Sequence, residues 1–287
     1  MSRGWRSLLF VPCDDQVRLA KIADRGADAV ILDLEDSIPS ERKPQARAGL
    51  PTIIRTLAER HCPLVIRVNT SWRDIYADLE VAVQPGVDAI MVPKVEAAPT
   101  LAIITEMLSE IASFRGLEVV PGLIPLIESP AGLAEVYEIA RIPSVIGLAL
   151  GSEDFSLALG VPPSPVALDL PCRLVALAAA RYDRLALGLP VSITTIDDEA
   201  AWRAGIQAGR SVGMTGALCI HPRQVAAANQ GFSPDAAEVE TAQRILDAWV
   251  ANGESGVTRL DGKMIDLPVV LAAKRLLLSS RIGVTSP

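Results

Sequence analysis

The chain has 287 residues, of which 50% are hydrophobic and only 4% aromatic, and its formal net charge at pH 7 is −7. This length suits either one large barrel or two small domains. The negative charge argues against a general nucleic-acid binder, which needs a basic face, and an anionic substrate would need locally placed Lys or Arg side chains.

The cysteines are widely separated and form no Cys-x-x-Cys pair: Cys13, Cys62, Cys172 and Cys219. This pattern is typical of reduced thiols in a cytosolic protein. The two histidines of the chain are too few for a multi-histidine metal centre. The apolar run near the N-terminus is too short for a signal peptide or a membrane span. We therefore expect a cytoplasmic, soluble protein that has no membrane partner.

Short apolar runs rich in Val, Ile and Leu recur along the chain, as expected of strands that are buried on both faces. There are eight of them: SLLFVP (7–12), AVILDLE (29–35), LVIRVN (64–69), AIMVPK (89–94), VVPGLIPLIE (119–128), VIGLALG (145–151), LPVSITT (189–195) and GALCIHP (216–222). Helical stretches lie between them, at 16–26, 42–60 and 198–213 among others. Eight such units predict an α/β fold, a (β/α)8 TIM barrel, over residues 1–230.

The pattern changes in residues 231–287, which predict a C-terminal helical extension. Residues 233–253 form one amphipathic helix, for which we expect Ser233 as N-cap and Pro234 at the first position. A polar hairpin follows at 254–268, and a last helix at 269–281. The extension is too small to be an independent domain, so it should pack on its own barrel or on a neighbour's.

Charged and polar residues interrupt the apolar runs at one end, and six of the eight runs carry them: Asp33, Glu35, Asp36, Arg67, Asn69, Lys94, Glu128, Glu153, Asp154 and His221. In barrels of this type the functional groups lie at the carboxyl ends of the strands. Carboxylates without a histidine cluster favour a hard cation with oxygen ligands, Mg²⁺ before Mn²⁺ or Ca²⁺. Glu128 and one of Glu153 and Asp154 fit such an ion, and Arg67 offers a planar fork for a carboxylate or an oxyanion.

Nine motifs, in order, resemble the citrate lyase beta-subunit-like proteins of the HpcH/HpaI aldolase superfamily, which also contains malyl-CoA and citramalyl-CoA lyases. They are RSLLFVP, ADAVILDLEDSI, KPQAR, VIRVN, DAIMVPKVE, LIPLIESPAGL, GLALGSEDF, CIHPRQV and DGKMIDLPVV. The resemblance runs from residue 6 to about residue 275. It implies a Mg²⁺-dependent carbon–carbon lyase that cleaves or condenses a 3-hydroxyacyl thioester, such as citramalyl-CoA, malyl-CoA or a citryl thioester.

The resemblance also implies roles for single residues. Glu128 and Asp154 correspond to the two magnesium ligands, with Glu128 also contacting substrate, and Arg67 corresponds to the substrate-contacting arginine. Lys43 and Arg47 resemble positions near the phosphates of the CoA or acyl-carrier thioester. In the family, which assembles as trimers or multiples of trimers, the segment that contains Asp266 reaches a neighbouring subunit's site and serves in acid–base chemistry. The resemblance thus implies a homotrimer or hexamer.

We expect Glu35 and Asp36 to contact and orient the metal ligands or the waters bound to the metal. The chain departs from the family at Cys13, where glycine is usual, and at Thr194 and Thr195, where an aspartate is usual. These departures leave substrate selectivity open. The alternatives are a malyl-CoA-type thioesterase with the same site, a CoA-independent keto-acid aldolase, and a non-catalytic subunit of a lyase complex.

Overall fold

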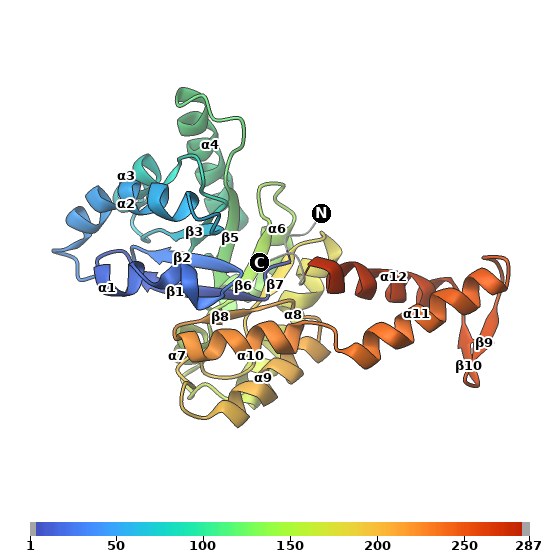
Figure 1. Ribbon diagram of the computed structural model, residues 1–287. Coiled ribbons are helices and arrows are strands. Elements are labelled where there is room, and N and C mark those ends of the chain that lie inside the picture. Colours follow the sequence, from blue (N-terminus) through green and yellow to red (C-terminus); the bar gives the residue numbers. More distant parts are fainter. Residues whose placement is uncertain (1–3, 283–287) are drawn as a thin grey trace. The chain divides into compact units, whose positions relative to one another are not determined.

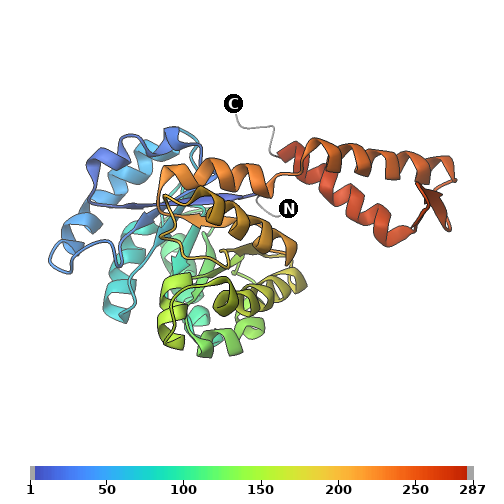
Figure 2. The same cartoon turned by 90° about the horizontal axis from the view of Figure 1, so that it is seen from below.

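In the computed structural model, which describes residues 4–282, eight parallel strands form a barrel surrounded by helices (Figures 1 and 2). The strands are β1 (Ser7–Pro12), β2 (Ala29–Asp33), β3 (Leu64–Arg67), β4 (Ala89–Val92), β5 (Gly122–Ile127), β6 (Gly147–Leu150), β7 (Leu185–Leu187) and β8 (Ala217–Cys219). Each strand pairs with the next one along the chain up to β7, and β1 also pairs with β8. A parallel bridge between Leu187 and Gly216 closes the ring. The predicted barrel is confirmed.

The helices of the barrel follow the strands and cover them on the outside (Figure 2). They are α1 (Gln16–Leu19), the 3₁₀ helix η1 (Ile22–Arg25), α2 (Lys43–Ala58), α3 (Trp72–Ala82), α4 (Ala98–Phe114), α5 (Pro130–Ala134), α6 (Val136–Ala140), α7 (Ser152–Leu159), α8 (Pro165–Arg181), α9 (Glu199–Ser211) and α10 (Pro222–Phe232). The single helix predicted at 16–26 is thus divided into α1 and η1. Gly26 ends η1 in the left-handed conformation, with φ 71°, which glycine adopts without a steric penalty.

Alternate residues of the strands fill the barrel interior, because successive side chains of a strand point to opposite faces. The interior cluster consists of buried apolar side chains contributed by all eight strands and by Trp5: Leu8, Ala29, Ile31, Val65, Ala89, Met91, Ile124, Leu126, Ala149, Leu185, Leu187 and Leu218. The barrel interior is therefore largely aliphatic. This packed interior supports the functional groups at the carboxyl rim.

The prediction of a seventh strand at 189–195 is wrong, because β7 is the shorter Leu185–Leu187 and the LPVSITT run is a loop. The backbone of this loop bonds to side chains instead of to a neighbouring strand. Ile193 N donates to Glu153 Oε1 at 3.0 Å, and Ile193 O accepts from Gln224 Nε2 at 2.8 Å. These partners satisfy the backbone N–H and C=O of Ile193, at the centre of the loop, without a strand.

The described residues divide into two compact units after Gln230. The second unit contains α11 (Ala236–Ala251), the hairpin of β9 (Thr258–Leu260) and β10 (Lys263–Ile265), and α12 (Leu267–Ile282). The hairpin joins the two helices (Figure 1). The small buried core of this second unit consists of Trp249, Ile265 and Val270. The predicted order of helix, hairpin and helix is therefore present.

The expected N-cap of α11 is wrong. Asp235, two residues after Ser233, accepts from Glu238 N at 2.7 Å, while the Glu238 side chain accepts from Asp235 N at 2.8 Å. This reciprocal capping box satisfies two backbone donors at once, which Ser233 could not do, because the residue three positions later is Ala236 and has no side-chain acceptor. Among residues 4–282, no helix combines the length and the apolar character needed to cross a membrane.

Candidate active site

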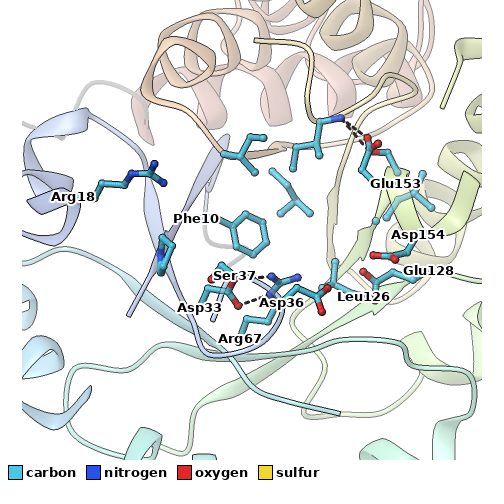
Figure 3. A pocket seen from close by; sticks show the side chains of 17 residues that line it. Phe10, Arg18, Asp33, Asp36, Ser37, Arg67, Leu126, Glu128, Glu153 and Asp154 are labelled. Atoms are coloured by element: carbon cyan, nitrogen blue, oxygen red, sulfur yellow. Dashed lines mark hydrogen bonds and ion pairs between the residues drawn. The ribbon is translucent and has the colours of Figure 1, made fainter. Parts of the chain in front are cut away.

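A cavity of about 380 Å³ opens at the carboxyl ends of the barrel strands. Acidic and basic side chains from several strand ends share it with an apolar wall (Figure 3). Its lining residues are Phe10, Pro12, Arg18, Asp33, Asp36, Ser37, Arg67, Leu126, Glu128, Leu150, Gly151, Ser152, Glu153, Asp154, Ile193, Leu218 and Ile220. The structure thus brings together six of the residues predicted from the strand ends: Asp33, Asp36, Arg67, Glu128, Glu153 and Asp154.

Glu128 and Asp154 lie next to each other on one side of the cavity (Figure 3). Glu128 follows β5 and is only 6% exposed, while Asp154 lies in the first turn of α7. Burial is the main reason that the pKa of Glu128 rises from 4.5 to about 7; the negative charges of Asp154 and Glu35 add to the rise, against the hydrogen bond from Lys94 N. A carboxylate desolvated beside another carboxylate is stabilised by a cation between them.

The backbone of Gly151, at the end of β6, makes room for the Glu128 side chain. A Cβ atom added to Gly151 would lie 2.6 Å from Glu128 Cγ and 2.7 Å from Glu128 Oε1. Within residues 4–282 no group of three or more His, Cys, Asp and Glu side chains is arranged to hold a metal ion. The Glu128 and Asp154 pair nevertheless fits Mg²⁺, which often takes one or two protein carboxylates and leaves its other positions to water and substrate.

Arg67, at the end of β3, is held by two carboxylates. Its Nε and Nη2 atoms donate to the two Asp33 oxygens, each at 2.7 Å, and Nη1 lies 3.0 Å from Glu35 Oε2. The guanidinium also lies over the Phe10 ring, 4.9 Å from its centroid. Although burial lowers the pKa of Arg67, the hydrogen bonds to Asp33 and the negative charges of Asp33, Glu35 and Asp36 outweigh it and raise this pKa above its ordinary value. Arg67 is therefore a fixed, fully charged group in the cavity wall.

Lys94, for which the sequence predicted no role, contacts both Glu128 and Glu35. Its backbone N donates to Glu128 Oε2 at 2.7 Å, and its Nζ donates to Glu35 Oε1 at 3.0 Å. The more exposed Asp36 lies 3.8 Å from the same Nζ. Glu35 therefore bridges Lys94 and Arg67, and burial raises its pKa despite these two cations. That Glu35 and Asp36 orient the metal ligands or their waters stays a prediction.

Glu153 and His221, which also follow strands, have structural partners. Glu153 Oε1 accepts from Ser192 Oγ at 2.8 Å and from Ile193 N at 3.0 Å, and so fixes the loop after β7. His221 Nδ1 accepts from Arg223 N at 3.2 Å at the start of α10. Of the two acids in the Gly-Ser-Glu-Asp-Phe motif, Asp154 is therefore the one that the structure leaves beside Glu128.

The residues predicted to contact the carrier phosphates lie at the start of α2. Lys43 Nζ donates to Asn69 Oδ1, and Arg47 Nε donates to Asp78 Oδ1 at 2.7 Å. Asp78 is fully buried, and burial raises its pKa in spite of its bonds to Asn69 and Arg47. Arg47 thus compensates a buried charge, and contacts of Lys43 and Arg47 with CoA stay a prediction.

Cys13 and Asp266 complete the predicted set. The Cys13 side chain is 1% exposed, and burial raises the pKa of its thiol well above the usual range. Asp266 belongs to the second unit, where its Oδ1 accepts from Val269 N at 3.3 Å at the start of α12. The role of Asp266 in a neighbouring subunit's site stays a prediction.

Two contacts in this site were not predicted from the sequence: the ion pair of Asp33 with Arg67 and the hydrogen bond from Lys94 N to Glu128. The signal for the first was available, because Asp33 ends β2 and Arg67 ends β3, and the parallel register places them opposite each other. The second depends on the backbone conformation of Lys94, which no side-chain pattern indicates.

Comparisons with known proteins identify the family of this chain. The family model described as HpcH/HpaI aldolase/citrate lyase matches residues 6–222. A citrate lyase subunit beta-like protein of Deinococcus radiodurans is 33% identical over 95% of this chain and 96% of its own length. A (3S)-malyl-CoA thioesterase of Cereibacter sphaeroides is 32% identical over 95% of this chain and 93% of its own.

A solved structure of CitE from Mycobacterium tuberculosis, in complex with magnesium, acetoacetate and coenzyme A, is similar throughout. Its TM-score is 0.74 at 29% sequence identity, and the match covers 96% of this chain and 97% of that one. The family match, the relatives of similar length and the eight-stranded barrel lead to one conclusion: the chain belongs to the HpcH/HpaI aldolase/citrate lyase family.

Proposed function

We propose that this chain is a Mg²⁺-dependent carbon–carbon lyase that acts on a 3-hydroxyacyl thioester whose hydroxyl carbon also bears a carboxylate. The products are a 2-keto acid and an acetyl or propionyl thioester. The observation that carries the proposal is the desolvated Glu128 carboxylate beside Asp154, with its pKa raised to about 7. Family membership and the magnesium and coenzyme A bound to the M. tuberculosis CitE structure support it.

Glu128 and Asp154 would hold the ion. When bound, Mg²⁺ supplies Lewis acidity that lowers the pKa of the substrate hydroxyl and polarises the product carbonyl. The hydroxyl oxygen loses its proton to water, the bond between C2 and C3 breaks, and the electron pair of that bond forms the thioester enolate while C3 becomes the keto carbon. Arg67, rigidly held by Asp33 and Glu35, stabilises the enolate oxygen; one such preorganised donor contributes about 3 to 4 kcal/mol.

The enolate must then gain a proton. We assign this step to Asp266 of a neighbouring copy in a homotrimer or hexamer, because its carboxyl group is partly exposed at the start of α12 in the second unit. The apolar side chains of the cavity wall, such as Leu126, Leu150 and Ile193, limit water around the reacting atoms. A dry site strengthens the interaction of Arg67 with the developing charge.

The test is a panel of malyl-CoA, citramalyl-CoA, β-methylmalyl-CoA and citryl-CoA, each incubated with the purified chain and Mg²⁺ or EDTA. The lyase forms glyoxylate, pyruvate or oxaloacetate together with the shortened acyl-CoA, only with Mg²⁺, and Glu128→Gln abolishes the reaction. No keto acid from any substrate, in a preparation that binds Mg²⁺, would contradict the lyase assignment.

A thioesterase is the second candidate, favoured by the 32% identity to the (3S)-malyl-CoA thioesterase of C. sphaeroides. The same assay separates the two reactions. A thioesterase releases free CoA and malate from malyl-CoA without glyoxylate, whereas the lyase releases glyoxylate and acetyl-CoA without a new free thiol.

A further inference from the structure

The backbone of Lys94 has an unusual conformation directly beside Glu128. Lys94 lies just beyond β4, and its φ angle of 53° places it in the left-handed region. For a residue with a side chain this conformation costs about 1 to 2 kcal/mol, because Cβ approaches the following carbonyl oxygen. Such residues persist when their surroundings fix them, and they are found preferentially at functional sites.

The turn that contains Lys94 is fixed from the β5 side. Val95 N donates to Leu126 O at 3.2 Å, and Lys94 N donates to Glu128 Oε2 at 2.7 Å. Gly132 of α5 packs against the same turn so closely that an added Cβ would lie 2.4 Å from Val95 O. The backbone amides of Lys94 and Val95 therefore both donate toward β5, the first to Glu128 directly after the strand and the second to Leu126 within it. The left-handed conformation of Lys94 sets the direction of its own N–H.

The consequence falls on the Glu128 carboxylate. One oxygen accepts the Lys94 amide, and on the other side Gly151 approaches Cγ and Oε1 so closely that no Cβ fits. These two backbone contacts define the rotation of the carboxylate. The Lys94 ammonium points to a different partner, Glu35, at 3.0 Å.

We propose that Lys94 is a positioning residue for the cation site, and that it acts through its left-handed backbone and amide rather than through its ammonium group. The inference rests on the proposed function, since it assumes that Glu128 binds Mg²⁺. It predicts that Mg²⁺ affinity depends on whether the residue at 94 tolerates a positive φ, and depends little on its charge.

Three substitutions separate the two contributions, because each removes the ammonium. Lys94→Met keeps a side chain that tolerates the conformation as lysine does, Lys94→Gly adopts it without strain, and the β-branched side chain of Lys94→Val opposes it. Mg²⁺ dissociation constants are measured by calorimetry on the full chain without substrate, with thermal unfolding and circular dichroism to compare the folds. Lys94→Thr, also β-branched, replaces the valine variant if that protein does not fold.

We expect Lys94→Met and Lys94→Gly to bind Mg²⁺ within about threefold of the unaltered chain, because a half-exposed ammonium paired elsewhere contributes little. The β-branched variant should bind about 10- to 100-fold more weakly, as is usual when a group that orients a metal ligand is lost. Lys94→Gly should also unfold at a higher temperature than Lys94→Met.

Two results would overturn the inference alone: a β-branched variant that binds as tightly as Lys94→Met, or equal weakening in all of the variants, which would assign the effect to the ammonium. An unaltered chain that binds no Mg²⁺ would overturn the proposed function and this inference with it. The Glu128→Gln variant, measured in parallel, identifies that last case by matching the unaltered chain.

Discussion

Arg67 and Asp33 form a bidentate ion pair in which two guanidinium nitrogens each lie 2.7 Å from one carboxylate oxygen. The two residues are directly opposite each other in the parallel register of β2 and β3. The sheet itself therefore sets the direction of the guanidinium, and Asp33 Oδ1, which accepts from Arg67 Nε, also accepts from Glu35 N at 3.0 Å.

Arg67→Lys should lower kcat/KM by about 100- to 1,000-fold, because lysine has no planar fork to keep one donor aimed at the enolate while binding Asp33. The Mg²⁺ dissociation constant should change little, since Arg67 is not one of the proposed ligands. Arg173→Lys, at a solvent-exposed pair with Asp169, is the matched control and should leave both quantities unchanged. Equal losses in the two variants would remove Arg67 from the mechanism.

Gly151→Ala should weaken Mg²⁺ binding and lower the free energy of unfolding by about 1 to 3 kcal/mol, as overpacking in a dense site does. The reason is that the new Cβ would meet Glu128 Cγ at 2.6 Å. Gly49→Ala is the control: its Cβ would meet nothing within 4 Å inside α2, so it should stabilise the protein slightly. Calorimetry and chemical denaturation measure the two effects, and a Gly151→Ala protein with normal Mg²⁺ affinity would contradict the role of this close approach.

The pKa of Glu128, about 7, predicts two pH effects. The folded chain holds this proton more tightly than the unfolded chain, where the ordinary value is 4.5. Raising the pH from 4.5 through 7 in the absence of Mg²⁺ should therefore destabilise the protein, by about 3 kcal/mol in total. Mg²⁺ binds the deprotonated form, so its affinity should rise about tenfold per pH unit below 7 and level off above.

Denaturation curves and Mg²⁺ titrations between pH 5 and 8 test both effects, and Glu128→Gln, which cannot titrate, should lack this component of the stability profile. An unaltered chain whose Mg²⁺ affinity is flat over this range would refute the assignment of Glu128 as a ligand with a raised pKa.

Asp266→Asn should lower kcat while leaving the fold and Mg²⁺ affinity intact, because asparagine can replace aspartate as the acceptor at the start of α12. If the site is shared between copies, mixing the impaired Asp266→Asn and Arg67→Ala proteins, with subunit exchange, should give more activity than either protein alone. A mixture no more active than its parts, in a preparation shown to contain hybrid oligomers, would place Asp266 outside a shared site.

The strands could be predicted because buried parallel strands leave continuous apolar runs, and the acids that end them, such as Glu128, stand out. This pattern left Glu153 and Asp154 as alternatives, and only the resemblance to the family singled out Asp154. Strand 7 could not be predicted. Its three residues, Leu185–Leu187, are shorter than the Val-, Ile- and Thr-rich loop that follows, and the loop is stabilised by Glu153 and Gln224, which are distant in sequence.

Other features depended on geometry that a linear pattern does not contain. The capping box of Asp235 and Glu238 competed with a reasonable Ser-Pro signal two residues earlier and was the stronger cap, because each residue satisfies a backbone donor of the other. The bond from Lys94 N to Glu128 arises from a positive φ at a lysine, a residue that gives no sign of this conformation in the sequence.

The bridge between Leu187 and Gly216 is the final join of the ring, and it contains few bonds: Gly188 N to Gly216 O at 2.9 Å and Thr215 N to Ala186 O at 2.7 Å are the shortest of them. A barrel opens first between the two neighbouring strands that share the fewest hydrogen bonds. Deuterium should therefore enter the amides of Gly188 and Thr215, which donate across this bridge, before those of β1 and β2, which pair along five residues. Local opening between β7 and β8 would also loosen the loop after β7, which is bonded to Glu153, the residue before Asp154. Heating should therefore disrupt the barrel and the proposed cation site together.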